Sequence, residues 1–159
     1  MWRTLLSVAL VIWVIDVTTK IWAVNYLSHR GSVKIIGSFF QLNFIRNSGA
    51  AFSFAPGATI LLSFFGIFVL VGILYYAQLI TSKGWAWVLG LVMGGILGNL
   101  SDRVFREPSL LRGHVIDWLQ LPHWPIFNIA DTSIVFAALL SMLLTVRNIS
   151  PISKNTPTN

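Results

Sequence analysis

The sequence predicts a mainly α-helical membrane protein with four transmembrane helices and a small extracytoplasmic β-rich region between the first and second helices. Of its 159 residues, 55% are hydrophobic and only 10% are charged, whereas soluble domains carry about a quarter charged residues. A globule of this length could not bury so much apolar surface, so lipid has to cover the remainder. We expect one membrane domain over residues 1–159, with spans at about 4–24, 58–80, 85–100 and 126–146 and extracytoplasmic segments at about 25–57 and 101–125.

The net charge and the cysteine count narrow the function classes. The charge is +6, but the Lys and Arg residues are scattered among apolar runs and form no basic stripe or arm. This pattern favours attraction to anionic lipid headgroups over nucleic-acid binding. The chain has no cysteine, which excludes disulfides, thiolate metal sites and a thiol nucleophile.

The first apolar run, at about 4–24, follows Arg3 and could be mistaken for a secretory signal. It lacks a small-x-small cleavage site and carries Asp16 and Lys20, so we expect a retained membrane helix. The two charges are spaced i, i+4 with the acid on the N-terminal side, which is the better orientation for an ion pair. We predict a structural salt bridge that lets both charges enter lipid together.

The segment at about 25–57 is polar and interrupted by Gly31, Gly37, Gly49 and Pro56. Within it, residues 33–52 are rich in β-branched and aromatic residues with partial alternation, so short strands fit better than a helix. We expect the aromatic side chains to lie at the membrane surface.

The remaining apolar runs differ in character. Residues 58–80 carry no charge and, at about 1.5 Å per residue, are long enough to cross a hydrocarbon core of roughly 30 Å. A short turn with Lys83 leads to the run at 85–100, whose glycines favour close helix packing; these are Gly90, Gly94, Gly95 and Gly98. The run at 126–146 follows a second polar segment.

With four spans, the polar ends of the apolar runs gather at one membrane face. Every acidic residue of the chain falls on that face, together with three asparagines and several basic residues. The residues of interest there are Asp16, Lys20, Asn47, Asn99, Asp102, Arg103, Asp117, Asn128 and Asp131. The segments on the opposite face are shorter and denser in basic residues, so we expect both termini in the cytoplasm.

Two of these acids flank the start of the fourth apolar run. Asp117 precedes the run and Asp131 lies in its first turns. A carboxylate near a bilayer core is disfavoured by roughly 2.5 to 3.5 kcal/mol, so an acid placed there is a candidate functional residue. The two form a candidate catalytic pair; a proton relay through Asp16, Asp117 and Asp131 in a small proton-coupled transporter, or a structural scaffold, are the alternatives.

Five blocks of sequence, in order, extend over most of the chain. They are Asp16-Val17-Thr18-Thr19-Lys20, Asn47-Ser48-Gly49-Ala50-Ala51-Phe52, Gly94 to Arg103 (GGILGNLSDR), Val115-Ile116-Asp117-Trp118 and Phe127-Asn128-Ile129-Ala130-Asp131. In these blocks the chain resembles bacterial lipoprotein signal peptidase, or signal peptidase II. It departs from the family's pattern in a shorter stretch between Asp117 and Asp131.

The resemblance implies an intramembrane aspartic peptidase of the bacterial inner membrane, with both termini cytoplasmic and its site toward the outer leaflet. The implied substrate is a prolipoprotein whose lipobox cysteine carries diacylglycerol, cut on the amino side of that cysteine. No cofactor and no nucleic acid are implied, and we expect a monomer in contact with membrane lipid. The implied catalytic residues are Asp117 and Asp131; the substrate-binding residues are Asn47, Gly49, Asn99, Arg103 and Asn128; the supporting residues are Asp16, Lys20, Asp102, Gly98 and Ala130.

The residues themselves can support that chemistry. Two close carboxylates cannot both ionise easily, so they share a proton. The ionised member takes a proton from water while the other donates to the scissile carbonyl oxygen. The pair titrates as a unit, which leaves open which aspartate is the acid and which the base.

The three histidines, His29, His114 and His123, show no HExxH-like spacing, so we expect no metal site and a loop position for His114.

The polar neighbours leave more than one interpretation. Asn99 and Asn128 fit substrate contact and inter-helix hydrogen bonding about equally. For Asp102 we favour a local ion pair with Arg103. Gly49 and Gly98 are expected to allow close backbone approach before any direct functional role.

Overall fold

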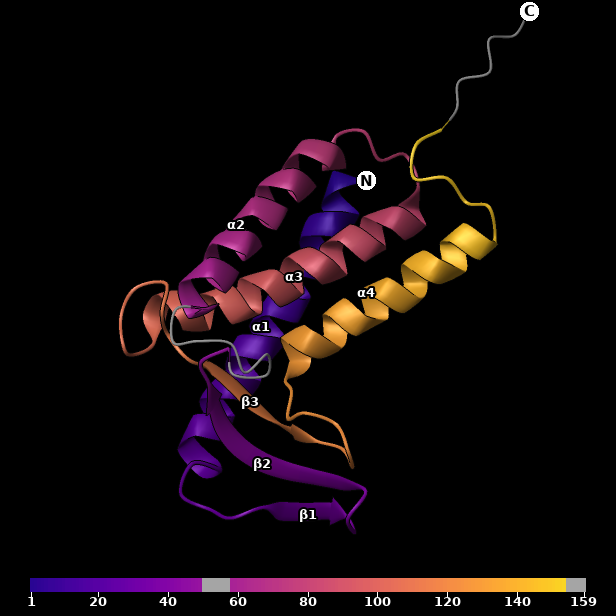
Figure 1. Cartoon of the computed structure of the whole chain (residues 1–159). Helices are drawn as coiled ribbons and strands as arrows, with labels where there is room; N and C mark the ends of the chain where they lie inside the picture. The colour runs from indigo at the N-terminus through magenta and orange to yellow at the C-terminus, as the bar shows by residue number, and fades with distance from the viewer. Residues whose placement is uncertain (50–57, 154–159) are drawn as a thin grey trace, which may run out of the picture.

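The computed structural model describes residues 1–49 and 58–153 and contains helices and a small sheet (Figure 1). The elements in chain order are α1 (Trp2–Tyr26), β1 (Val33–Ile36), β2 (Phe40–Asn47), α2 (Ala58–Ala77), α3 (Lys83–Phe105), β3 (Val115–Gln120) and α4 (Ile129–Val146). The helices form one end of the molecule and the sheet lies at the other. The N-terminus, the α2–α3 connection and the end of α4 lie away from the sheet (Figure 1).

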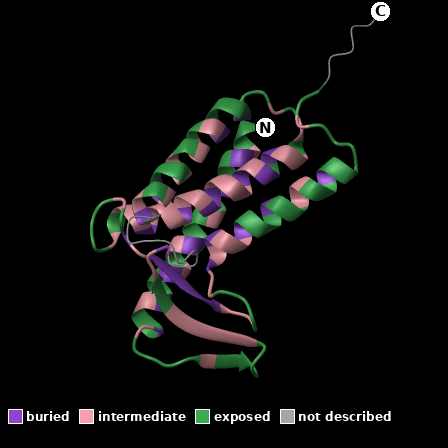
Figure 2. Ribbon diagram, in the orientation of Figure 1, coloured by how far each residue is buried: buried purple, intermediate pink, exposed green. Residues whose placement is uncertain are grey.

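Four helices in the described part of the chain are long and apolar enough to cross a membrane. They expose large apolar side chains along their outer faces, such as Leu61 at 70%, Phe68 at 74% and Met142 at 67%, and exposed residues recur along α2 and α4 (Figure 2). An apolar surface of this kind is stable in lipid and not in water. The predicted class, a mainly helical membrane protein with a small β-rich region, is confirmed.

Helix α3 is the centre of the bundle, because it packs against each of the other three helices. Its glycines make this possible. A Cβ at Gly90 or Gly94 would lie 2.8 Å from a carbonyl oxygen of α1, at Leu5 or Ala9, and a Cβ at Gly95 would lie 2.6 Å from the Ala130 carbonyl oxygen of α4. The predicted role of these glycines in close packing is confirmed.

Several helix ends differ from their sequence-based positions, and two of these ends carry residues of interest. Helix α3 continues to Phe105, so Asp102 and Arg103 lie in its last turns and not in the polar segment expected from residue 101. The charge of Asp102 is tolerated there because Asp102 is paired with Lys20 of α1 and with Arg106, which directly follows α3. Helix α4 begins at Ile129 and not at 126, because the Asn128 side chain caps it.

The sheet has the order β1-β2-β3 and both pairings are antiparallel. Strands β1 and β2 lie within the predicted strand region, whose last residues fall outside the described part. Strand β3 was not predicted; it comes from the connection between α3 and α4 and pairs with β2 so that Ile45 lies opposite Asp117. Its residues are the most buried of the sheet (Figure 2).

The sheet is attached to the end of α1 by a small apolar core. Ala23 and Leu27 of α1 pack with Ile116, Trp118 and Leu119 of β3. Asp117 therefore lies on a strand that contacts both β2 and the end of α1.

Candidate active site

Asp131 is positioned by the start of α4. The Asn128 side-chain oxygen accepts from the Asp131 backbone N–H at 2.9 Å, and an Asp131 carboxylate oxygen accepts from the Asn128 backbone N–H at 3.3 Å. This reciprocal pair is a capping box, which satisfies two N–H groups that a helix start otherwise leaves unpaired. The local sequence Asn-x-x-Asp therefore fixes both the helix start and the carboxylate.

Asp117 lies in the middle of β3 and is 1% exposed. Its two carboxylate oxygens accept from two amide groups: Asn47 Nδ2 at 2.8 Å and Asn128 Nδ2 at 2.6 Å. Burial raises the pKa of Asp117 to about 6; the hydrogen bond from Asn47 opposes this shift, the nearby charge of Asp131 adds to it, and the Asn128 amide opposes it.

Asn128 connects the two carboxyl groups directly. Its side-chain amide donates to Asp117 while its backbone N–H donates to Asp131. Asn99 completes the arrangement: its Nδ2 donates to Asp131 at 2.8 Å, and its Oδ1 accepts from Asn128 Nδ2 at 3.1 Å. The side-chain amides of three asparagines, Asn47, Asn99 and Asn128, thus hydrogen-bond to the two aspartates.

A buried ion network lies behind the aspartates. Lys20 is 0% exposed and its ammonium contacts Asp16 at 2.7 Å, Asp102 at 3.0 Å and Asn99 Oδ1 at 2.9 Å. Arg106 pairs with the other oxygen of Asp102. The two acids balance the two bases, which is the condition for burying charge at acceptable cost.

One predicted ion pair is confirmed and another is wrong. The Asp16–Lys20 pair is present, although Lys20 also bridges from α1 to α3. Asp102 pairs with Lys20 and Arg106 and not with Arg103. The reason is helix geometry: neighbouring residues point to different faces, whereas i and i+4 share one.

A cavity of about 470 Å³ opens over the aspartates. Its polar end is formed by Asn47, Gly49, Asn99, Arg103, Asp117 and Asp131. Its apolar part runs between helices α2, α3 and α4 and is lined by Leu62, Phe65, Gly66, Val69, Ile96, Leu100, Ile134 and Val135. The site therefore joins a carboxylate pair to an apolar groove between the apolar helices.

Arg103 brings positive charge to this cavity. Its guanidinium interacts electrostatically with Asp117, Asp102 and Asp131. The buried Nη1 atom finds no hydrogen-bond partner within residues 1–49 and 58–153. A donor of this kind, placed beside two acids, can hold a carbonyl oxygen of a bound peptide.

Comparison with known proteins places the chain in a family. A family model described as Signal peptidase (SPase) II matches residues 8–147. The chain belongs to the signal peptidase II family. It is similar to the lipoprotein signal peptidases of Mycobacterium leprae (strain Br4923), at 45% identity over 91% of this chain and 72% of the relative, and of Mycobacterium tuberculosis (strain ATCC 25618 / H37Rv), at 46% identity over 91% and 71%.

A solved structure agrees with the sequence relatives. It is titled "Bacterial membrane enzyme structure by the in meso method at 1.9 A resolution" and has a TM-score of 0.80 at 25% identity, covering 92% of this chain and 94% of that chain. Membership in the signal peptidase II family makes the chain a peptidase. With its four apolar helices, it is a multi-pass protein of the bacterial inner membrane.

The predicted site positions Gly49, Gly98 and Ala130 have defined contacts in the structure. Gly49 has a φ of +99°, which disfavours other residues, and its N–H donates to Asn47 Oδ1 at 2.8 Å. This bond directs the Asn47 Nδ2 toward Asp117. Gly98 faces Asp16, since a Cβ there would lie 2.9 Å from the Asp16 carboxyl carbon, and the Ala130 N–H donates to Asp16 at 2.8 Å.

His114 lies away from the aspartates, and several residues that line the cavity over them were not predicted from the sequence. His114 lines a separate cavity with Arg46 and Glu107. No group of three His, Asp or Glu side chains that could hold a metal occurs in the described part of the chain. Trp124, between β3 and α4, and the apolar residues of α2 line the active-site cavity; in the sequence they carry no polar signal that would single them out.

Proposed function

We propose that this member of the signal peptidase II family is an aspartic endopeptidase that removes signal peptides from prolipoproteins. Its cut lies on the amino side of a lipobox cysteine that carries diacylglycerol. The single observation that carries this proposal is the position of Asp117 and Asp131. They are joined through Asn128 at the polar end of a cavity whose other end is an apolar groove.

The reaction uses one proton shared by the two carboxyl groups. We assign it to Asp117, whose pKa burial raises to about 6. Ionised Asp131 takes a proton from water as the water oxygen attacks the scissile carbonyl carbon, and Asp117 donates its proton to the carbonyl oxygen. Collapse of this intermediate breaks the C–N bond: Asp117 takes back a proton from one of the two hydroxyl groups, and the proton held by Asp131 leaves with the cysteine amino group.

The cavity supplies contacts for a lipid-modified peptide. Arg103 and Asn99 line the cavity; in this proposal Arg103, and the amide hydrogen of Asn99 that is not used for Asp131, donate to backbone carbonyl oxygens near the scissile bond. The groove between α2 and α4, which lie on either side of α3 (Figure 1), suits apolar chains that remain in the bilayer. Binding energy from those chains would orient the scissile bond, which is how remote contacts aid catalysis.

The test is cleavage of a synthetic diacylglyceryl-modified lipobox peptide by the purified protein in detergent. We expect the wild type to cut before the modified cysteine, and Asp117→Asn and Asp131→Asn each to lose at least about a thousandfold in kcat while remaining folded, since loss of a catalytic group in hydrolases has effects of this order. An unmodified peptide serves as the control for lipid recognition. Near-normal turnover by either folded variant would refute the two-aspartate mechanism.

A proton-coupled transporter using Asp16, Asp117 and Asp131 is not favoured. All acidic residues of the chain lie at or near the sheet end of the helices, and none lies in the other half of a span. A relay across the bilayer needs groups on both halves.

A further inference from the structure

Two aspartates outside the catalytic pair contact the backbone in an equivalent way. Asp16 accepts a hydrogen bond from the N–H of Ala130 at 2.8 Å, and Asp102 accepts one from the N–H of Ile116 at 3.1 Å. Ala130 immediately precedes Asp131, and Ile116 immediately precedes Asp117. Each buried acid therefore holds the main chain one residue before a catalytic carboxyl group.

Lys20 joins these two acids. Its ammonium lies 2.7 Å from Asp16 and 3.0 Å from Asp102. We name Asp16, Lys20 and Asp102 the positioning triad. All three side chains are almost fully buried, at 0%, 0% and 4% exposure, so solvent does not compete for their contacts. The triad thus gives a continuous path from the backbone of Ala130 to the backbone of Ile116, made of two ion pairs in the middle and one carboxylate hydrogen bond at each end.

The triad also fixes the orientation of Asn99. An ammonium has only donors, so Asn99 must turn its oxygen to Lys20, at 2.9 Å. Its Nδ2 then faces Asp131, to which it donates at 2.8 Å. The oxygen and nitrogen of an amide have similar shapes, and the contact with Lys20 decides which of the two Asn99 atoms faces Asp131.

The surrounding residues support this role. Gly98 allows Asp16 to approach α3, because a Cβ there would overlap the Asp16 carboxylate. Ala130 lies in the first turn of α4, where backbone N–H groups have no partner within the helix. The bond from Asp16 therefore supplies a contact that the helix itself cannot.

We propose that the positioning triad sets the separation and facing of the Asp117 and Asp131 carboxyl groups, and that its members are positioning residues for the peptidase. This inference rests on the proposed function. It extends that function by assigning a catalytic consequence to three residues that touch neither water nor peptide at the reacting centre. A displacement of about 1 Å at a reacting group can reduce turnover by roughly a hundredfold.

The two acids differ in a way that makes the proposal testable. Asp16 uses one oxygen for the N–H of Ala130 and the other for the ammonium of Lys20. Asp16→Asn therefore places its NH₂ group, a donor, opposite one of these two donors, and the contact with that partner is lost. Asp102 uses a single oxygen, Oδ2, for both Ile116 and Lys20. Asp102→Asn can keep both links, because its NH₂ would face only Arg106, whose side chain is 28% exposed and can turn to solvent.

The expected results in the cleavage assay follow from this difference. Asp16→Asn and Asp102→Leu should lower kcat by roughly tenfold to a hundredfold with KM changed less than about threefold. Asp102→Asn should keep kcat within about threefold of the wild type. Two matched controls should behave as the wild type. Arg106→Gln removes a partner of Asp102 but none of the contacts that lead to Asp117 or Asp131. Trp13→Phe removes the hydrogen bond between Trp13 of α1 and Ser101 of α3.

Amide hydrogen exchange provides a readout that does not depend on activity. Asp16→Asn should reduce protection in the peptide containing Ala130, Asp102→Leu should reduce it in the peptide containing Ile116, and Asp102→Asn should leave both unchanged. If Asp16→Asn does not fold, the comparison of Asp102→Leu with Asp102→Asn carries the same test. Unchanged exchange in Asp16→Asn and Asp102→Leu, or equal losses of kcat in Asp16→Asn and Asp102→Asn, would overturn the proposed role of the triad. An inactive wild type that still shows the expected exchange pattern would overturn only the proposed function.

Discussion

Asp117 and Asp131, the two proposed catalytic residues, have different surroundings. Asp117 comes from a buried strand and receives two side-chain amide donors, while Asp131 comes from the first turn of a helix and receives a backbone N–H and the Asn99 amide. Burial is the main reason that the pKa of Asp117 rises to about 6. Two carboxyl groups in unequal environments are the usual basis for dividing acid and base roles.

This inequality predicts the pH dependence of the enzyme. A raised pKa means that Asp117 keeps its proton up to about pH 6 and loses it above. If that proton is the one donated to the substrate, kcat/KM should fall as pH rises through about 6, and fall again at low pH when both carboxyl groups are protonated. The measurement is kcat/KM from pH 4 to 8, with Trp13→Phe as a control of unchanged profile. A flat profile between pH 5 and 8 would contradict the assignment.

Asn128 should matter for more than the helix start. Serine at this position is also a good N-cap, but its shorter side chain cannot reach Asp117, 2.6 Å beyond the asparagine Nδ2. We therefore expect Asn128→Ser to keep α4 stable to within about 1 kcal/mol and to lower kcat at least tenfold. Thermal unfolding and turnover, measured together, separate the two effects. A fall in kcat that is explained entirely by the fraction of unfolded protein would show that Asn128 acts through folding alone.

Most residues of the candidate site could be recognised from the sequence, but not their partners. Charged and amide side chains at membrane depth are unusual, and that alone marks Asp16, Lys20 and Asn99. The partner of Asp102 could not be assigned, because it depends on how far α3 extends and which face of it meets α1. The cavity residues of α2 could not be found either, since an apolar side chain facing a cavity looks like one facing lipid.

At the scale of elements, α3 determines where the aspartates lie. It packs against α1 through Gly90 and Gly94 and against α4 through Gly95. The aspartate of α4 can approach the sheet only if α4 lies this close to α3, because the Ala130 carbonyl would meet any side chain at Gly95 at 2.6 Å.

Gly95→Ala should therefore displace α4 and Asp131 with it. We expect a loss of stability of about 1 to 3 kcal/mol from overpacking and a fall in kcat of at least tenfold from misplacement of the carboxylate. Gly72→Ala is the matched control, since a Cβ at Gly72 in α2 meets no atom within 4 Å. Unfolding in detergent and peptide turnover are the measurements. An active and stable Gly95→Ala protein would show that the α3–α4 contact can relax without moving the site.

Strand β3 shows why part of the fold could not be predicted. Its residues are almost all buried, so the sequence Val-Ile-Asp-Trp-Leu-Gln has no alternation of polar and apolar residues, which is the main local signal of a strand. The strand is specified by distant partners: β2 on one side and the end of α1 on the other. By contrast, the four spans carry their signal in their own composition.

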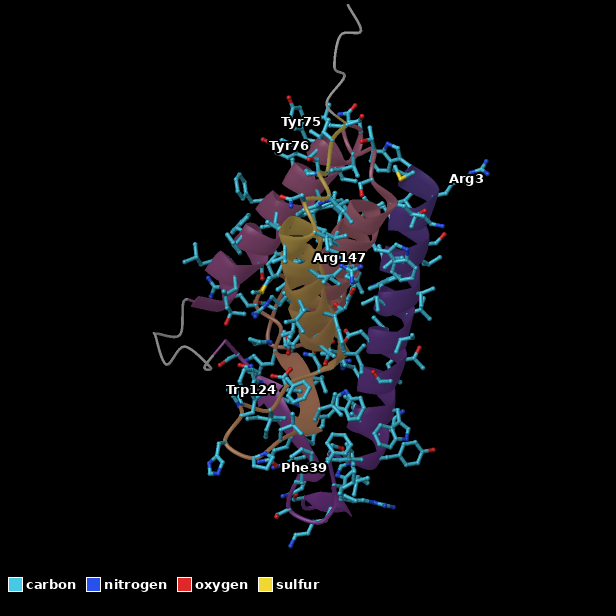
Figure 3. The ribbon with its side chains drawn as sticks, turned by 90° about the vertical axis from the view of Figure 1, so that its right-hand side faces the viewer. Arg3, Phe39, Tyr75, Tyr76, Trp124 and Arg147 are labelled. Atoms are coloured by element: carbon cyan, nitrogen blue, oxygen red, sulfur yellow. The ribbon has the colours of Figure 1, made fainter. Side chains whose placement is uncertain are left out.

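At the scale of the whole molecule, the site lies where the helices meet the sheet. Asp117 is contributed by the sheet and Asp131 by the bundle, so the two proposed catalytic groups meet only when both parts are folded and docked. The labelled side chains mark the two ends: Arg3, Tyr75 and Tyr76 lie at one end, and Phe39 lies at the other with Trp124 nearer to it (Figure 3). The direction in which the sheet end faces decides from which leaflet the substrate is cut.

We predict that the sheet end faces away from the cytoplasm, because the short segments at the other end are dense in basic residues, with Arg3, Lys83 and Arg147. The chain has no cysteine, so single cysteines report position without background. Phe39→Cys, at a side chain that is 64% exposed, should react with a membrane-impermeant maleimide in intact spheroplasts. Arg3→Cys, also at an exposed position, should react only after the membrane is permeabilised. Retained turnover in both variants shows that the label reads the native orientation, and the reverse pattern of labelling would place the aspartates at the cytoplasmic face, where a signal peptide already translocated across the membrane could not be cut as proposed.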